Sequence, residues 1–306
     1  MSSIANDNDT KASSNDLLQP FQLDTSNFRG RIVRLSDTLD DILKAHDYPK
    51  VVSRLLGDAL VVTTLLGGML KYEGVFTLQA SSKGLIRLVV CDMLSDGTIR
   101  GYASFDEEEI KKLDPETEYS LKELMGEGYL AFTVDHKMAD RYQGVVELQD
   151  NNFVQSINHY FEQSEQIMTS MKSAVALENN KWCAGALMLQ KLPEQDQLQA
   201  VEKDDWIRSD IFLQSCKREE LLDEALPLND LLFRLFNEEG VIVFPPTELK
   251  KGCRCTRDRV ISILTTLSED DLDYAEKENG LEMVCEFCSK AYHFTKDEIL
   301  EKRDEK

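Results

Sequence analysis

Apolar and polar residues alternate in short segments along the first two thirds of the chain, a pattern that predicts strands with inserted helices. Five of these segments are rich in β-branched and aromatic residues and are bounded by turn-forming residues: 75–79, 85–91, 98–103, 129–135 and 145–148. Further strands are predicted at 28–34, 174–178 and 183–189. Because no regular βαβ repeat is present, the pattern favours an α+β domain of mixed sheet and helices over residues 28–193.

The most apolar long stretch of the chain lies at 51–70. Arg54 and Asp58 interrupt it, and its apolar residues recur at helical spacing. The stretch is therefore interpreted as a largely buried helix rather than a membrane span. Shorter helices are predicted at 36–45 and 153–168.

Composition changes on both sides of this domain. The first twenty residues are rich in Ser, Asn and Asp with few large apolar groups, so 1–27 is predicted to be a disordered tail. Between 194 and 230, eleven acidic residues against four basic residues give a net charge of −7. Apolar residues set among these charges predict an acidic helical linker at 194–240 whose apolar stripe docks on a neighbouring surface. An ordinary charged helical hairpin is the alternative.

The final segment, 241–306, is predicted to be a small separate domain. A strand, a short helix and a hairpin are expected in it, at 241–244, 257–267 and 281–294. Thr295 and Glu298 have the spacing of a capping box for a last helix.

Two cysteine pairs in this domain carry the clearest chemistry in the sequence. Cys253 and Cys255 form one pair, Cys285 and Cys288 form the other, and 29 residues separate the pairs. Four thiolates in two tight pairs meet the demand of a tetrahedral zinc ion, and four protein ligands leave no open position for hydrolytic chemistry. Gly252 allows a close backbone approach just before the first pair.

The cysteines admit interpretations other than zinc ligation. A thioredoxin-like redox motif would need its CxxC in a βαβ context, which is not predicted here. His293 could replace one thiol but is expected to be a hairpin side chain. Cys91 and Cys183 lie in apolar segments and are predicted to be inert core residues. Cys216 could be exposed in the acidic linker, where carboxylate neighbours would disfavour its thiolate.

Loss of the metal is expected to unfold the small domain. A domain of roughly 60 residues buries little surface, and zinc binding to such a site contributes on the order of 10–16 kcal/mol, much of it folding free energy. Oxidation of the thiolates would remove the ligands, and the linker would then lose its docking surface and expose apolar side chains.

Charge and motifs exclude several functional classes. The net charge of −21 disfavours binding to phosphate backbones and to anionic membranes. The N-terminus lacks the pattern of a secretory signal, so we expect a cytoplasmic protein in which thiols stay reduced. No phosphate-binding glycine loop or GxSxG elbow is present, and no nucleophile accompanies the histidines at 46, 136 and 159. We therefore expect a protein that is not an enzyme.

The cysteine motifs read Gly-Cys-Arg-Cys at 252–255 and Val-Cys-Glu-Phe-Cys at 284–288. Together with Gly-Tyr-Leu at 128–130, Tyr-Gln-Gly-Val at 142–145 and Tyr-Phe-Glu-Gln-Ser-Glu-Gln at 160–166, they resemble the heat-shock protein 33 family of bacterial chaperones. The resemblance runs from about residue 28 to the C-terminus and includes the acidic linker. Met168-Thr169 departs from the family, which usually has proline before this threonine, and this is expected to alter the end of the predicted helix.

The resemblance implies a redox-regulated, ATP-independent holdase. In such proteins the reduced form, with one zinc ion per chain, is monomeric and inactive. Oxidation joins the two cysteines within each motif, which maps onto Cys253–Cys255 and Cys285–Cys288, and releases zinc. The linker then unfolds, and the protein dimerises and holds unfolding client proteins under oxidative or heat stress.

Two other functional classes make different predictions. A disulfide oxidoreductase using Cys285 and Cys288 would turn over a dithiol substrate, whereas a holdase acts stoichiometrically. A zinc-ribbon module would bind DNA or RNA with a salt-sensitive affinity, but the acidic charge and the lack of a basic aromatic stripe disfavour it.

Overall fold

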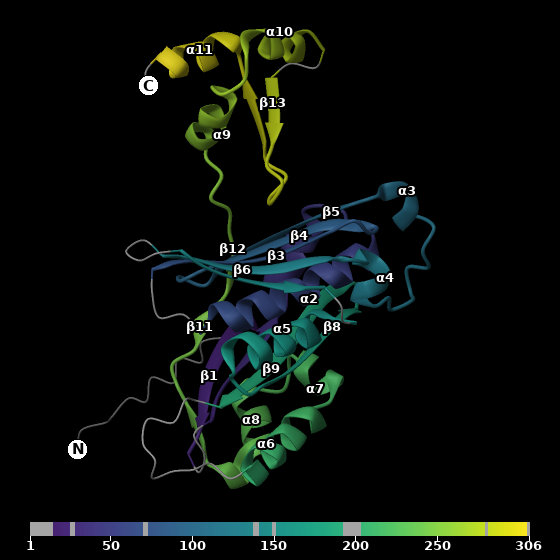
Figure 1. The fold of residues 1–306 in the computed structure, drawn as a ribbon, viewed down its shortest axis with the longest axis vertical. Coiled ribbons are helices and arrows are strands. Elements are labelled where there is room, and N and C mark those ends of the chain that lie inside the picture. The colour runs from purple at the N-terminus through teal and green to yellow at the C-terminus, as the bar shows by residue number, and fades with distance from the viewer. Residues whose placement is uncertain are drawn as a thin grey trace, which may run out of the picture.

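In the computed structural model, two six-stranded sheets pack on either side of one long helix (Figure 1). The structure describes residues 15–24, 28–69, 73–136, 141–148, 151–191, 203–278 and 281–304. The central helix is α2 (Lys50–Gly67), which contacts strands of both sheets. It is apolar on most of its circumference because both sheets cover it, which confirms the predicted buried helix. Among the described residues, no helix is long and apolar enough to cross a membrane.

The first sheet is antiparallel and brings together segments from distant parts of the chain. Its strand order is β10-β1-β2-β9-β8, and β11 also pairs with β1. The strands of this sheet are β1 (Leu17–Leu23), β2 (Phe28–Leu35), β8 (Thr169–Glu178), β9 (Lys181–Lys191), β10 (Val241–Val243) and β11 (Thr247–Glu248). The strands predicted at 28–34, 183–189 and 241–244 are confirmed within a few residues.

The second sheet contains the five strands predicted between 75 and 148. Its order is β12-β5-β4-β3-β6-β7, antiparallel except for the β12–β5 pair. The strands of this sheet are β3 (Gly74–Ser82), β4 (Ile86–Leu94), β5 (Thr98–Phe105), β6 (Gly128–His136), β7 (Tyr142–Glu147) and β12 (Lys250–Lys251). Gly97, with φ of 82°, forms the turn between β4 and β5.

Short helices complete the N-terminal domain. They are α1 (Asp37–Lys44), α3 (Glu107–Ile110), α4 (Leu121–Met125) and α5 (Phe153–Tyr160). The helix predicted at 153–168 is too long, because α5 passes into a π-helical turn (Phe161–Glu165) and Gln166 adopts a left-handed conformation. Strand β8 then begins at Thr169 rather than 174, since its first residues pair with the end of β9.

Three linker helices cover the outer face of the first sheet: α6 (Lys203–Ser215), α7 (Arg218–Leu222) and α8 (Leu228–Phe236). Alternate residues of β2 and β9 point to opposite faces, so Ile32 and Leu187 face the linker while Val33 and Ala186 face α2. The linker contributes buried leucines to this contact, which confirms that its apolar stripe docks on a neighbouring surface. A short 3-10 turn, Asn237–Glu239, follows α8.

Two predicted segment assignments are wrong. The segment 17–23, placed in a disordered tail over 1–27, forms β1 because its buried side chains pack on both sides of the first sheet; residues 1–14 and 25–27 lie outside the described residues. Residues 241–251, assigned to the C-terminal domain, form β10, β11 and β12 and belong to the two large sheets. Their pairing partners lie more than 140 residues away, so no local pattern could reveal them.

The C-terminal module comprises the elements after β12 and has a small core of its own. Its elements are α9 (Arg257–Leu264), α10 (Glu269–Glu278), β13 (Leu281–Val284), β14 (Ala291–Phe294) and α11 (Lys296–Asp304). The predicted hairpin is confirmed, and so is the capping box, in which Thr295 and Glu298 each bind the other's backbone N–H. Helix α10 was not predicted from its strongly acidic sequence.

Candidate metal centre

The first cysteine pair is placed by the edge strand β12. Lys251 pairs with Ile99 of β5, and the N–H of Gly252 donates to the Ile99 carbonyl at 3.1 Å. A Cβ on Gly252 would lie 2.4 Å from the Thr98 side chain, which confirms the close approach predicted for this glycine. The chain therefore runs along β5 up to Cys253.

The second cysteine pair lies in the tip of the β13–β14 hairpin, which points toward the second sheet in Figure 1. Within the tip, the N–H groups of Cys288 and Ser289 both donate to the Cys285 carbonyl, at 3.3 and 2.8 Å. Ser289 has a φ of 55°, which reverses the chain into β14. This tight turn aims both sulfurs of the motif in one direction.

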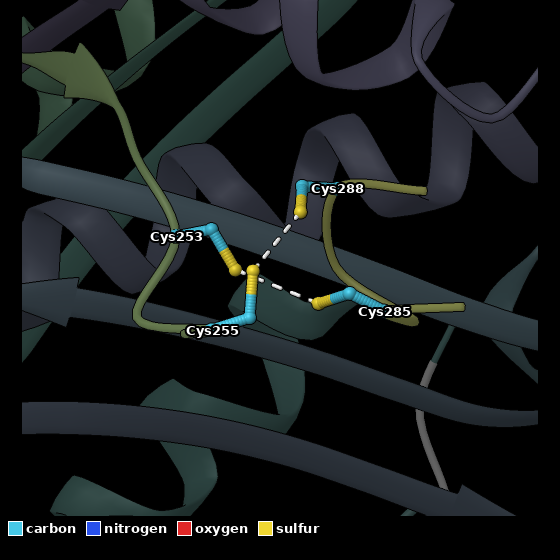
Figure 2. Close-up of side chains that lie close together, drawn as sticks. All are labelled: Cys253, Cys255, Cys285 and Cys288. Carbon is cyan, nitrogen blue, oxygen red and sulfur yellow. Dashed lines mark hydrogen bonds between the residues drawn. The ribbon is translucent and has the colours of Figure 1, made fainter. Parts of the chain in front are cut away.

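The four sulfurs form one compact group (Figure 2). All lie within 4.8 Å of one another, and the separations Cys253–Cys285 and Cys255–Cys288 are 3.6 and 3.4 Å. A tetrahedral zinc ion with bonds of about 2.3 Å requires sulfur separations of about 3.8 Å, whereas a disulfide requires about 2.05 Å. The dimensions therefore fit a metal ion held by four thiolates, with the half-buried cysteines as its ligands.

Hydrogen bonds and burial shift the pKa of Cys253 downward and the pKa values of Cys285 and Cys288 upward. Burial raises the pKa of Cys253, but hydrogen bonds from the backbone of Cys255, from neighbouring thiols and from Arg100 outweigh it and bring the pKa to about 7. Burial raises the pKa of Cys288 to about 12 and also raises the pKa of Cys285, and adjacent sulfurs add to both shifts. A divalent cation would displace these protons, because metal binding deprotonates thiols.

Side chains from outside the two motifs surround the sulfurs. Tyr292 of β14 donates its hydroxyl to Cys255 Sγ at 3.3 Å. Arg100 of β5 lies 3.7 Å from Cys253 Sγ through Nη1. His46, after α1, contacts the hairpin tip through the Phe287 carbonyl and the Ser289 hydroxyl, both at 3.2 Å.

The structure places the other candidate residues away from the four-cysteine group. His293 is exposed on β14, as expected of a hairpin side chain. Cys91 and Cys183 are buried in strands, which confirms them as core residues. Cys216 is fully buried beneath the linker, so the expectation that it could be exposed is wrong; its thiol packs into the contact between linker and sheet.

Sequence reasoning missed Arg100, His46 and Tyr292 as neighbours of the centre. Tyr292 follows Cys288 closely and belongs to the same hairpin, so its place could have been anticipated from alternation. Arg100 and His46 carry no local signal, since only the tertiary fold brings Arg100 to Cys253 Sγ and His46 to the hairpin tip.

The fold and the site define a class: an α+β protein whose small C-terminal module carries four clustered cysteines that could hold a metal ion, next to a larger domain. The sequence model of the Hsp33 protein family matches residues 16–295. The chain therefore belongs to the Hsp33 family.

Curated relatives extend over nearly the whole chain. The 33 kDa chaperonin of Caulobacter vibrioides is 34% identical over 284 residues, covering 90% of this chain and 94% of the relative. The 33 kDa chaperonin of Proteus mirabilis is 35% identical over 289 residues, covering 94% and 96%. A crystal structure of the 33 kDa chaperonin from Thermotoga maritima has the same fold, with a TM-score of 0.78, 22% identity, and coverage of 94% of this chain and 98% of that one.

Proposed function

We propose that this protein is a redox-regulated, ATP-independent holdase chaperone that binds unfolding proteins and prevents their aggregation. The observation that carries the proposal is the group of four sulfurs at metal-binding distances in a small module. Membership of a family whose relatives are named 33 kDa chaperonin supports the chaperone activity. Zinc is the proposed metal, one ion per chain, because soft thiolates in a closed tetrahedral set favour it.

Cys253, Cys255, Cys285 and Cys288 would hold the zinc ion, which would supply much of the folding free energy of the module. Among the described residues of the module, eight buried side chains form its core, with a few partly buried neighbours. A core of this size gives little stability without a metal or another cross-link. The reduced protein is proposed to be an inactive monomer in the cytoplasm.

Oxidation is proposed to join Cys253 to Cys255 and Cys285 to Cys288, the pairing implied by the family resemblance. For each pair, one molecule of peroxide accepts two electrons from two thiolates and, with two protons, leaves as water while one S–S bond forms. A disulfide no longer offers thiolates to the metal, so zinc departs and the module loses its main stabilising contact.

Undocking of the linker would expose the face of the first sheet that it covers. That face contains the fully buried side chains of Phe21, Phe28 and Ile32. The ring of Phe21 stacks on Phe236 of α8, and the ring of Phe28 meets Trp206 of α6 edge to face. An apolar face of this kind is suited to hold unfolding proteins, which expose apolar surface of their own. The oxidised form is proposed to dimerise and to bind clients stoichiometrically, without catalytic turnover.

The test combines metal content with chaperone activity in the same samples. Zinc per chain is measured before and after peroxide treatment at mildly raised temperature, and suppression of heat-induced citrate synthase aggregation is followed in parallel. We expect one zinc ion per chain to be lost as anti-aggregation activity appears. A variant with Cys285→Ser and Cys288→Ser is the control for the metal site. Retention of zinc without any gain of activity after oxidation would refute the proposal.

A further inference from the structure

One side chain of the N-terminal domain contacts both cysteine motifs of the module. Arg100 Nη1 lies 3.7 Å from Cys253 Sγ, in the first motif. The guanidinium carbon of Arg100 lies 3.8 Å from the ring centroid of Phe287, which stands between the two cysteines of the second motif. A single cation on the second sheet therefore bridges the two halves of the metal centre.

The strand register explains why Arg100 reaches this position. β12 runs parallel to β5 with Lys251 opposite Ile99, and the N–H of Gly252 bonds to the Ile99 carbonyl. Arg100 follows Ile99 along β5, and Cys253 follows Gly252 along the neighbouring segment of the chain. The backbone pairing of β12 with β5 therefore positions Arg100 next to Cys253.

A buried carboxylate holds the guanidinium in place. Asp92 of β4 accepts hydrogen bonds from Arg100 Nε at 2.8 Å and from Nη2 at 2.5 Å, and Thr77 donates to its other oxygen at 2.6 Å. The Asp92 side chain is only 4% exposed and that of Arg100 11%. Arg254, between the first two cysteines, also reaches Asp92, at 3.4 Å. The free Nη1 of Arg100 is thereby aimed at the sulfur.

Charge gives this contact a chemical role. Four thiolates around a divalent zinc ion carry a net charge of −2, which a half-buried site must balance. A guanidinium that donates to a ligand sulfur withdraws electron density from it, so the sulfur is less reactive toward an electrophile and the reduced centre is stabilised. A disulfide sulfur is neutral and accepts hydrogen bonds poorly, so oxidation would break the same contact.

We propose that Arg100 is a positioning residue of the metal centre, which keeps Cys253 as a protected thiolate and fastens the module to the second sheet while the centre is reduced. The proposal rests on the proposed zinc switch and adds a residue from outside the module to it. Arg100 stacks on Phe287 and binds Cys253, so loss of the thiolate would remove one of the contacts that hold the module on the sheet that carries Arg100.

The test compares Arg100→Gln, Arg100→Lys and the unaltered chain. Arg87→Gln is the matched control, because Arg87 lies on the neighbouring strand β4 and pairs with Asp106 instead. The zinc affinity of the reduced protein is measured by competition with a coloured chelator, and the rate of zinc release is measured at a fixed peroxide concentration. Cobalt substitution adds a spectroscopic readout, since thiolate-to-cobalt absorption bands report directly on the sulfurs.

We expect Arg100→Gln to weaken zinc binding about 10- to 100-fold, the range typical of outer partners of metal ligands, and to accelerate release by peroxide. Its thiolate-to-cobalt bands should shift, while Arg87→Gln matches the unaltered chain. Arg100→Lys keeps the charge but not the planar stack and should be intermediate. Unchanged affinity, release rate and cobalt bands in Arg100→Gln would overturn the proposal.

These readouts separate the proposal from the proposed function. They require no chaperone activity, so the role of Arg100 can fail while the unaltered protein still gains activity on oxidation. Conversely, an unaltered protein that releases zinc without gaining activity would refute the holdase and leave the role of Arg100 standing.

Discussion

The charged residues that interrupt the apolar helix α2 have a local explanation in the structure. Arg54 and Asp58, one turn apart, both line a cavity of about 190 Å³ between α2, β8 and linker helix α7. Arg54 donates to the Thr117 carbonyl at 3.1 Å, and Asp58 accepts from the Ser173 hydroxyl at 2.6 Å. The two residues therefore face a polar cavity while the rest of the helix faces the two sheets.

Asp58 should make stability depend on pH. Burial raises the pKa of its carboxyl from 3.8 to about 6. The folded state binds this proton more tightly than the unfolded chain does. Asp58 therefore contributes its full stabilisation at pH values below the pKa of its carboxyl in the unfolded chain, and this stabilisation is lost as pH rises through about 6.

Asp58→Asn removes this proton-linked contribution. Between about pH 5 and pH 7.5, its free energy of unfolding relative to the unaltered protein should rise by about 1 kcal/mol. Urea unfolding at several pH values measures this difference. A difference that does not vary with pH would contradict the assignment.

Hydrogen bonds between tyrosines join the sequence motifs at 142–145 and 160–166. Tyr142 and Tyr160 hydrogen bond to each other at 2.6 Å, and Tyr160 also donates to Glu165 at 2.7 Å. A Cβ on Gly144 would lie 2.3 Å from the Tyr160 hydroxyl. The glycine of the 142–145 motif is thus needed to admit the tyrosine of the 160–166 motif.

At the scale of elements, the linker is a set of amphipathic helices that depends on its docking surface. Helix α8 buries Leu231, Leu232 and Phe236 completely against the first sheet, whereas Phe233 on its other side is 64% exposed. Helices of five to thirteen residues are marginal in isolation, so most of their stability comes from this contact.

Leu232→Ala should therefore loosen the linker without oxidation. Removing a fully buried leucine costs about 2–5 kcal/mol, which would shift the docked linker toward its open state. We expect amide hydrogen exchange in α8 to accelerate and the reduced, metal-bound protein to suppress aggregation partly. Phe233→Ala is the matched control and should change neither. Unchanged exchange and activity in Leu232→Ala would show that this contact does not restrain the linker.

At the scale of the whole molecule, three cores differ in size and independence. The largest surrounds α2 between the two sheets, the second lies under the linker, and the third belongs to the C-terminal module. The module is covalently joined to β12, and Phe287 in its hairpin tip lies against Arg100 and Tyr102 of β5 in the second sheet (Figure 1). Loss of its fold should therefore leave the largest core intact.

Removal of the metal with a strong chelator under reducing conditions tests this independence. Hydrogen exchange over residues 257–304 should rise to that of an unfolded chain, because the small core lacks its main stabilising contribution. The exchange protection of α2 should remain, and added zinc should restore protection of the module. A module that stays protected without metal would show that the eight-residue core is sufficient.

The elements with a local period and the grouping of the four cysteines could both be predicted from the sequence alone. Helix α2, strands β3 to β7 and the β13–β14 hairpin each show their pattern within a few residues, because side-chain spacing depends only on local backbone geometry. The cysteine cluster was equally evident, since two short cysteine motifs predict a metal site by residue type and spacing.

Only the tertiary structure decided the features that depend on distant pairing. β1 pairs with β10 across more than 200 residues, so the ends of the N-terminal domain could not be located from the sequence. The burial of Cys216 depends on linker docking, and the contact of Arg100 with Cys253 depends on the register of β12 against β5. Strands of two or three residues, such as β10 and β12, are too short to show a period of apolar residues. A contact between a side chain and a sulfur 153 positions away produces no pattern in the local sequence.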